Sequence, residues 1–283
     1  MPSARFGTPL ALPTGLDAFA EWSVSIVDLG VGDSPRTLAE HDADLLLSSA
    51  SVGKVFVLIE LAERLAAGTL DADLLLDRRV TSRITDSGLW HRLHIDRLPL
   101  LDVVTLVGAV SDNWATNVLI DLLGLERIRA TARRWAPGGS DLVDVVRGLR
   151  GPQDPPHLSL GCARDWTGIL ARLWADDRAG GAVGHLVLGA LTPGVDLSMV
   201  ASAFDLDPLA HDEDPAGPLL INKTGTNLGV RCDIGIIEDE AHPIAYAVLA
   251  NWSEEPAGRG REQVMSAMRS IGGAIRIIGG ASE

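Results

Sequence analysis

Basic residues are scarce in this chain of 283 residues, which has 24 Lys and Arg against 38 Asp and Glu and a formal net charge of −14. A surface with this excess of negative charge repels polyanions, so the composition argues against nucleic acid or an anionic membrane as a partner. The net charge does not restrict a small-molecule substrate, because the local charge of a pocket can oppose that of the whole protein.

Cysteine is rarer still, with Cys162 and Cys232 alone. Two cysteines are too few for a disulfide framework, and no Cys-x-x-Cys pair or Cys/His cluster has the spacing of a zinc site. We therefore expect two free, buried thiols, no metal and no cofactor.

Long hydrophobic runs are also missing, and no apolar stretch reaches transmembrane length. The first 22 residues contain one Arg and an interrupted apolar stretch, which does not make a convincing secretion signal. We expect a cytoplasmic protein as the chain is given, or a periplasmic or secreted one if a signal has been trimmed.

The patterns that are present predict an α/β (α+β) fold, with an antiparallel sheet built from both chain ends, flanking helices and a mostly helical lobe. Sheet residues would come from 1–50 and 200–283, an all-helical domain from 51–199, and the active site would lie between them. A long irregular loop covers 141–157. Strands are predicted at 22–28, 36–40, 219–224, 230–237 and 243–252, and helices at 16–21 (capped by Thr14), 51–67, 100–109, 115–123, 126–135, 163–174, 182–190 and 259–275.

The stretch LLLSSASVGKVFVLIELAERLA, residues 45–66, contains Ser51 and Lys54 as a Ser-x-x-Lys pair at the start of a helix. Residues three apart lie on one helix face, so the two side chains are neighbours. A partly desolvated lysine can lose its proton and activate the serine, and the positive end of the helix would stabilise a developing anion. Alone, the pair is a weak signal that occurs by chance.

Two further segments carry polar residues that chemistry could use. Ser111, Asp112 and Asn113 precede a helix, where such residues commonly serve as N-caps. Lys223-Thr224-Gly225-Thr226 ends a predicted strand, where the lysine could simply be solvated.

Taken together and in this order, Ser-x-x-Lys, Ser-Asp-Asn and Lys-Thr-Gly form the triple signature of the penicillin-recognising serine enzymes. The segments VSDNWATNVLIDLLG and LLINKTGTNLGVRCDIGII resemble those of class A β-lactamases, as does the interval between Ser51 and Ser111. The resemblance covers about residues 22–275. It implies a β-lactamase/transpeptidase-like fold and a serine hydrolase that works through an acyl-enzyme.

The resemblance also implies roles for the motif residues. Ser51 would attack a carbonyl, and Lys54 would receive or relay its proton. Ser111 would pass a proton to the leaving group, and Lys223 would lie beside it. Asn113 would orient Lys54 and hydrogen-bond a substrate amide.

On the strand side, Lys223 and Thr224, with or without Arg231, would hold a substrate carboxylate. Gly225 would let the strand approach the substrate closely. The backbone N–H groups of Ser51 and Thr226 would form the oxyanion hole.

One family feature is missing. Class A enzymes carry a Glu in the long loop, in a Glu-x-x-Leu-Asn pattern, and it positions the deacylating water, whereas residues 141–157 contain no Glu. Asp144 is the best substitute by position, His157 is an outside candidate, and each loop Asp could equally be solvated or a cap. Deacylation could therefore be slow.

Three other residues have open alternatives. Arg231 could assist carboxylate binding or be an ordinary strand residue. Trp90 could be a stacking wall for a substrate or surface aromatic packing, and Trp114 could serve in core packing.

The first hypothesis is thus a class A β-lactamase-like hydrolase that opens β-lactam amides. The alternatives are an esterase, amidase or D-peptidase of the penicillin-binding type, and a catalytically weak covalent binder of β-lactams or cell-wall fragments. The expected partner is a small molecule, a β-lactam, ester or amide with a carboxylate. The oligomeric state is open.

Overall fold

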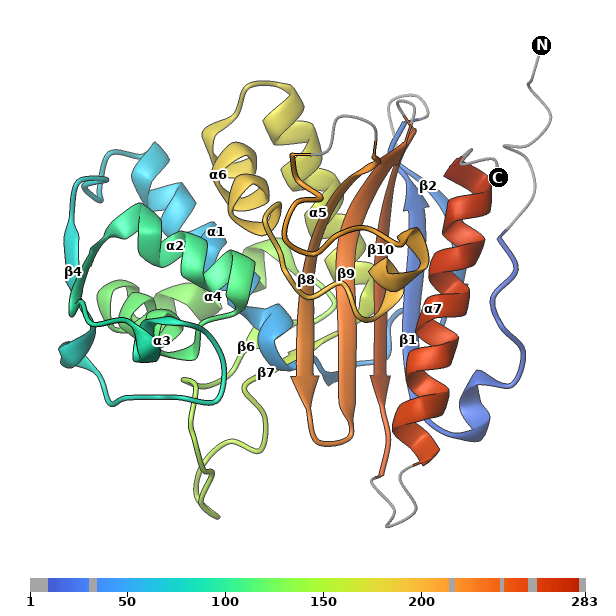
Figure 1. Cartoon of the computed structure of the whole chain (residues 1–283), viewed down its shortest axis with the longest axis horizontal. Helices are drawn as coiled ribbons and strands as arrows, with labels where there is room; N and C mark the ends of the chain where they lie inside the picture. The colour runs from blue at the N-terminus through green and yellow to red at the C-terminus, as the bar shows by residue number, and fades with distance from the viewer. Residues whose placement is uncertain (1–9, 31–34, 214–216, 240–241, 254–258, 280–283) are drawn as a thin grey trace.

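The protein is described by a computed structural model covering residues 10–30, 35–213, 217–239, 242–253 and 259–279. Its centre is a five-stranded antiparallel sheet in the order β2-β1-β10-β9-β8 (Figure 1). Pairing of β1 with β10, with Val24 opposite Val248, joins the two ends of the chain in one sheet. The strands are β1 (Glu21–Asp28), β2 (Arg36–His41), β8 (Leu219–Asn227), β9 (Val230–Asp239) and β10 (His242–Asn251).

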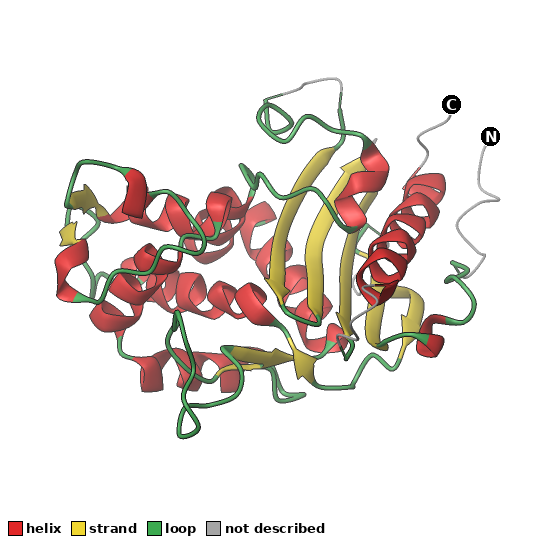
Figure 2. Cartoon of the chain, turned by 60° about the horizontal axis from the view of Figure 1, so that its bottom comes forward, coloured by secondary structure: helices red, strands yellow, loops and turns green. Residues whose placement is uncertain are grey.

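The helices lie mostly on one side of this sheet, and α7 covers the other face together with the 3₁₀ turn Val200–Phe204 (Figure 2). Since side chains alternate along a strand, β10 serves both layers. Ala247 and Leu249 join the core shared with the helices, while Tyr246 and Val248 join the core beneath α7. The helices are α1 (Lys54–Ala66), α2 (Leu100–Val110), α3 (Asn113–Leu123), α4 (Leu125–Trp135), α5 (Ala163–Arg178), α6 (Ala182–Leu191) and α7 (Arg259–Gly279).

The predicted fold class is confirmed: the sheet comes from both chain ends, helices flank it, and a helical part lies beside it. The division into a sheet domain (1–50 and 200–283) and a helical domain (51–199) stays a prediction. Helix α5 falls in the second range and packs on β1 and β10. The helices and one face of the sheet share a single core cluster.

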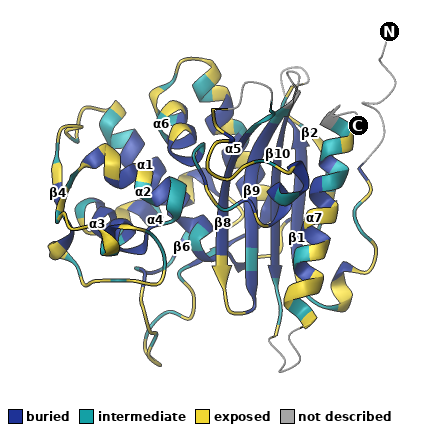
Figure 3. Ribbon diagram, in the orientation of Figure 1, coloured by how far each residue is buried: buried dark blue, intermediate teal, exposed yellow. Residues whose placement is uncertain are grey.

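Strand β1 is more buried than its alternating pattern predicts. Every residue from Trp22 to Val27 is buried, because α5 covers one face of the strand and α7 the other (Figure 3). The serine hydroxyls on the α5 side form hydrogen bonds within the protein. Ser25 Oγ lies 3.0 Å from Thr167 Oγ1 on α5, so polar residues here are buried with partners.

Several short strands and 3₁₀ turns differ from the sequence-based prediction or have no counterpart in it. The predicted helix at 16–21 is a single 3₁₀ turn, Leu16–Ala18, and its N-cap is Gly15 at φ 75° in place of Thr14. The predicted helix at 51–67 begins as a 3₁₀ turn, Ala50–Gly53. The missed strands are β3 (Leu47–Ser48), β4 (Leu75–Asp77), β5 (Arg97–Pro99), β6 (Asp141–Leu142) and β7 (Ser159–Gly161), and further 3₁₀ turns are Arg78–Val80, Trp90–Arg92 and Val200–Phe204.

The long loop between β6 and β7 extends below the helical part in Figure 1. Both cysteines are buried and unpaired, as expected. Within the described ranges, no helix combines the length and the apolar character needed to cross a membrane.

Candidate active site

Ser51 lies in the 3₁₀ turn that leads into α1, at the edge of strand β8. Ala50, just before it, has φ 46°, a left-handed conformation that is costly for a residue with a Cβ. A Cβ added at Gly225 would lie only 2.4 Å from the carbonyl oxygen of Ser49 and 3.2 Å from the backbone nitrogen of Ser51. Glycine at 225 therefore allows β8 to touch the turn that presents Ser51.

Lys54, in the first turn of α1, is fully buried. Its Nζ donates to Ser111 O at 2.6 Å, to Ser111 Oγ at 3.1 Å and to Asn113 Oδ1 at 2.6 Å. Burial lowers the pKa of Lys54 well below its ordinary value, and the charge of Lys223 lowers it further, against the opposing carboxylates of Asp112 and Asp86. Of the three acceptors, only the Ser111 hydroxyl can also donate, so a neutral Lys54 amine can exchange a proton with it.

The Ser-Asp-Asn segment serves as both helix cap and side-chain support. Ser111 has φ 54° at the end of α2, and Asp112 caps α3 by accepting from Ala115 N at 2.9 Å. The other oxygen of Asp112 accepts from Leu89 N and Trp90 N, at 2.7 Å each, which fixes the loop ahead of β5 and α2 against the start of α3. The segment therefore caps α3 through Asp112 while Ser111 and Asn113 accept hydrogen bonds from Lys54.

Asn113 uses both ends of its amide. Its Oδ1 accepts from Lys54, while Nδ2 donates to Oδ1 of Asp86, an exposed residue at the rim of the site. Sequence reasoning did not single out Asp86.

On β8, Lys223 is nearly fully buried, and its Nζ donates to Thr224 O at 2.8 Å. Burial lowers the pKa of Lys223 to about 8, although the carboxylates of Asp196 and Asp233 act in the opposite direction. Thr224 Oγ1 donates to Asp196 Oδ2 at 2.8 Å. Asp196 lies in the loop after α6 and belongs to no motif, so no pattern in the sequence marked it.

These groups surround one cavity of about 250 Å³. Six predicted site residues line it, and Lys54 lies behind them. The remaining walls come from the loop between the 3₁₀ turns Arg78–Val80 and Trp90–Arg92, the C-terminal end of α2 and the loop after α6. The lining residues are Ser51, Asp86, Ser87, Gly108, Ala109, Val110, Ser111, Asn113, Gly194, Val195, Asp196, Asn222, Lys223, Thr224 and Thr226.

The sequence profile described as "Beta-lactamase enzyme family" matches residues 15–276. The chain belongs to this family. It is a β-lactamase-like serine hydrolase, as the resemblance implied. No curated protein sequence matches the chain.

Solved structures agree with the β-lactamase fold. A β-lactamase from Sphaerobacter thermophilus has a TM-score of 0.76 and 23% identity, covering 93% of each chain. A class A β-lactamase from Mycobacterium abscessus has a TM-score of 0.68 and 21% identity, covering 93% of this chain and 96% of that one. A mutant of PBP-A, described as an acyl-enzyme complex with penicillin G, has a TM-score of 0.70 and 17% identity, covering 94% and 97%. At these sequence identities, the structural similarity is evidence for the fold alone.

Two predicted substrate contacts of this β-lactamase-family chain lie elsewhere. Trp90 is fully buried, donates from Nε1 to Ile95 O at 3.1 Å and packs near Trp114 with ring centroids 6.5 Å apart, so the prediction of a stacking wall is wrong. Arg231 donates to Asn227 O at 2.9 Å and Val230 O at 2.7 Å, and is not among the residues lining the cavity. Its geometry matches the strand-residue alternative.

Asp144, the predicted substitute for the loop Glu, is buried among arginines. Arg147 Nε donates to Asp144 Oδ2 at 2.7 Å, and Arg150 Nη1 donates to the same oxygen. Burial raises the pKa of Asp144, but the hydrogen bonds from the two arginines outweigh it and leave the pKa below its ordinary value. A carboxylate held this way is a weak base, and it does not line the cavity.

The loop instead meets α3 through Val146. Asn117 Nδ2 donates to Val146 O at 2.8 Å, and Val146 N donates to Asn117 Oδ1 at 2.9 Å. Asn117 lies one helical turn after Asn113, on the same face of α3. The residue that the loop holds against this helix is therefore apolar.

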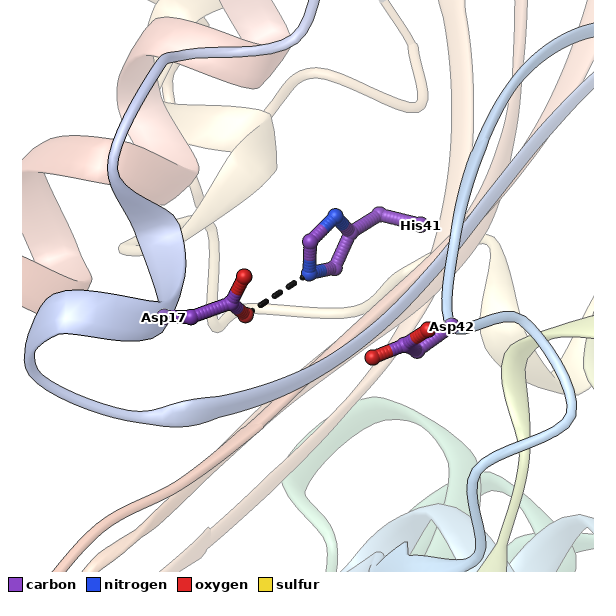
Figure 4. A group of neighbouring side chains, drawn as sticks. All are labelled: Asp17, His41 and Asp42. Carbon is purple, nitrogen blue, oxygen red and sulfur yellow. Dashed lines mark hydrogen bonds and ion pairs between the residues drawn. The ribbon is translucent and has the colours of Figure 1, made fainter.

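A second group of polar side chains lies apart from the cavity (Figure 4). Asp17, His41 and Asp42 have ligand atoms within 4.8 Å of one another, and His41 Nε2 lies 2.8 Å from Asp17 Oδ1. His41 ends β2, the edge strand opposite β8. Both aspartates are exposed, and surface ion pairs of this kind are common, so the group supports no metal assignment.

Proposed function

We propose that this protein opens β-lactam amides or related ester and amide carbonyls through an acyl-enzyme on Ser51. The observation that carries the proposal is Lys54, a fully buried lysine whose lowered pKa favours the neutral, basic amine one turn from Ser51. The Ser51 hydroxyl proton would pass to Lys54 as Oγ attacks the carbonyl carbon. An acyl-enzyme with penicillin G in the PBP-A mutant, which shares this fold, supports the same chemistry here.

Collapse of the tetrahedral intermediate needs a proton on the departing nitrogen or oxygen. We assign that transfer to Ser111, whose hydroxyl is within 3.1 Å of Lys54 Nζ. The backbone N–H groups of Ser51 and Thr226 would stabilise the oxyanion, a contribution of about 3 kcal/mol per donor. Asn113 would orient Lys54 and retains one N–H for a substrate amide.

Deacylation is the slow step in this proposal. The loop of residues 141–157 has no Glu, and its buried carboxylate, Asp144, is neutralised by Arg147 and Arg150. Water would then attack the acyl-enzyme without a carboxylate to activate it. An esterase, amidase or D-peptidase remains the second candidate, and a covalent binder the third.

Incubation with a chromogenic cephalosporin and a fluorescent penicillin tests the proposal, with turnover and intact mass followed together. We expect a mass adduct on Ser51 that forms faster than it decays. Rapid steady turnover without an adduct would contradict slow deacylation, and ester turnover without reaction of either β-lactam would favour the esterase.

Ser51→Ala should abolish the adduct. Ser270→Ala, a matched change on α7 behind the sheet, should not. If Ser51→Ala reacted like the unaltered protein, the assignment of the nucleophile would be wrong.

A further inference from the structure

The cavity contains more negative than positive charge. Among its lining residues Asp86 and Asp196 are acidic and Lys223 alone is basic. A pocket built to hold a substrate carboxylate requires the reverse balance, because a charge-assisted hydrogen bond needs an uncommitted cationic or hydroxyl donor.

Asp196 is fixed beside the Lys-Thr-Gly motif. Its Oδ2 accepts from Thr224 Oγ1 at 2.8 Å, and its Oδ1 accepts from Ser198 Oγ at 2.7 Å and Ser198 N at 3.2 Å. The Thr224 hydroxyl proton, which a substrate carboxylate would need, is therefore already directed at a carboxylate of the protein.

The basic side chains Lys223 and Arg231 do little to offset the negative charge of Asp196 for a substrate carboxylate. Lys223 directs Nζ to Thr224 O at 2.8 Å, and the negative charge of Asp196 acts on its ammonium group. Arg231, the other candidate, donates to Asn227 O and Val230 O and lies outside the lining. A substrate carboxylate placed at Thr224 would approach Asp196 as a like charge, which destabilises binding.

We infer that the site, acting by the acyl-enzyme chemistry proposed above, selects esters or amides whose leaving group carries an ammonium group facing Thr224 and Asp196. Neutral leaving groups are accepted next, and carboxylate-bearing ones last. In the reaction Ser51 Oγ bonds to the carbonyl carbon, the bond to the leaving oxygen or nitrogen breaks, and the proton released by Ser51 reaches that atom through Lys54 and Ser111. Asp196 takes no part in these transfers and acts on charge selection alone.

Three phenylacetyl esters isolate the charge of the leaving group: those of 3-hydroxybenzoate (anionic), 3-methylphenol (neutral) and 3-(trimethylammonio)phenol (cationic). For the unaltered protein we expect kcat/KM, divided by the rate constant for alkaline hydrolysis of the same ester, to be about tenfold higher for the cationic than for the anionic ester. Asp196→Asn keeps an acceptor for Thr224 and removes the charge, so this ratio should fall about tenfold.

Asp207→Asn is the matched control. Asp207 accepts from Leu209 N two residues on, as Asp196 does from Ser198 N. It lies in the same connection between α6 and β8, beyond the 3₁₀ turn Val200–Phe204 and outside the cavity lining, so the substitution removes the same charge from the protein as a whole. It should leave the ratio unchanged. Asp196→Ser is the second variant, should Asp196→Asn not fold.

A preference for the anionic ester, or the same ratio in Asp196→Asn as in the unaltered protein, would overturn the inference while leaving the nucleophile in place. Turnover of all three esters by Ser51→Ala would overturn the proposed function instead. If the unaltered protein neither turned over nor was acylated by any of the esters, the inference would fail, while the penicillin adduct on Ser51 would still decide the proposed function.

Discussion

Val146 is the residue through which the long loop contacts helix α3. Both its backbone polar groups are held by Asn117, one helical turn from the amide that binds Lys54, and its side chain is buried. A carboxylate at this position would lie on the face of α3 that supports the site. Arg147 and Arg150 are already paired with Asp144, so a glutamate at 146 would keep its basicity.

We therefore predict that Val146→Glu accelerates deacylation by about 10²-fold, the usual contribution of a positioned general base. Time-resolved intact mass of the penicillin adduct measures this directly. Leu149→Glu is the control, because Leu149 is 94% exposed on the same loop. A glutamate there adds the same charge, but in solvent. An adduct of unchanged lifetime in a folded Val146→Glu protein would show that the loop does not face the acyl group.

At the scale of residues, the sequence predicts contacts between side chains that are only a few positions apart in the chain. Ser51 with Lys54, and Ser111 with Asn113, are neighbours because helical geometry and capping bring them together locally. Asp196 reaches Thr224 only through the tertiary path of the loop after α6, which no spacing reveals. The burial of Trp90 depends on a tertiary partner, Trp114, which local spacing does not reveal.

At the scale of elements, α2 and α6 approach each other through Gly108. A Cβ built there would lie 1.9 Å from the carbonyl oxygen of Ala190. Helix α2 ends at Val110 with Ser111 as its C-cap, and Gly108 itself lines the cavity. The spacing of these two helices therefore sets the wall of the site.

Gly108→Ala should force the helices apart and lower the free energy of unfolding by about 1–3 kcal/mol. Gly189→Ala on α6 is the matched change, since Gly189 is exposed with nothing within 4 Å of an added Cβ. It should raise stability by about 0.5–1 kcal/mol through helix propensity. Urea unfolding of both variants checks the pair, and equal effects would mean that the α2–α6 contact is not tight.

Long periodic elements were predictable, and short ones were not. All seven helices that the structure describes have predicted counterparts, because an apolar stripe over ten or more residues is a strong signal. The strands β3 to β7 have two or three residues each and are held by tertiary pairing, so they left no pattern. The burial of β1 was underestimated because its serines find partners on neighbouring segments, Ser25 with α5 and Ser23 with Ala43.

At the scale of the whole molecule, two layers of helix enclose the sheet, and a carboxyl group is enclosed with it. Asp233 on β9 is fully buried, and it accepts from Asn222 Nδ2 at 3.1 Å, from Tyr246 OH at 3.3 Å and from Ala201 N at 3.3 Å. Burial raises the pKa of Asp233 to about 7, and the nearby charge of Asp196 adds to this. The hydrogen bonds only partly offset the cost of ionisation.

This raised pKa gives stability a defined pH dependence. The unfolded chain loses the Asp233 proton near pH 3.9, whereas the folded protein keeps it until about pH 7. Between these values the folded state binds more protons, so the free energy of unfolding falls as pH rises, and the loss is complete above about pH 7. From pH 5 to pH 8, Asp233 should account for a loss of roughly 3 kcal/mol.

Asp233→Asn removes this contribution and keeps an acceptor for Asn222 and Tyr246, although the new amide faces Ala201 N with a donor. Its absolute stability is therefore a poor readout, and the change between pH 5 and pH 8 is the informative one. Urea unfolding at the two pH values should show a smaller loss in Asp233→Asn than in the unaltered protein, while Asp205→Asn, an exposed change near α7, should keep the full loss. Equal losses in all three proteins would mean that Asp233 is ionised at pH 5 in the fold, and that its three donors outweigh burial.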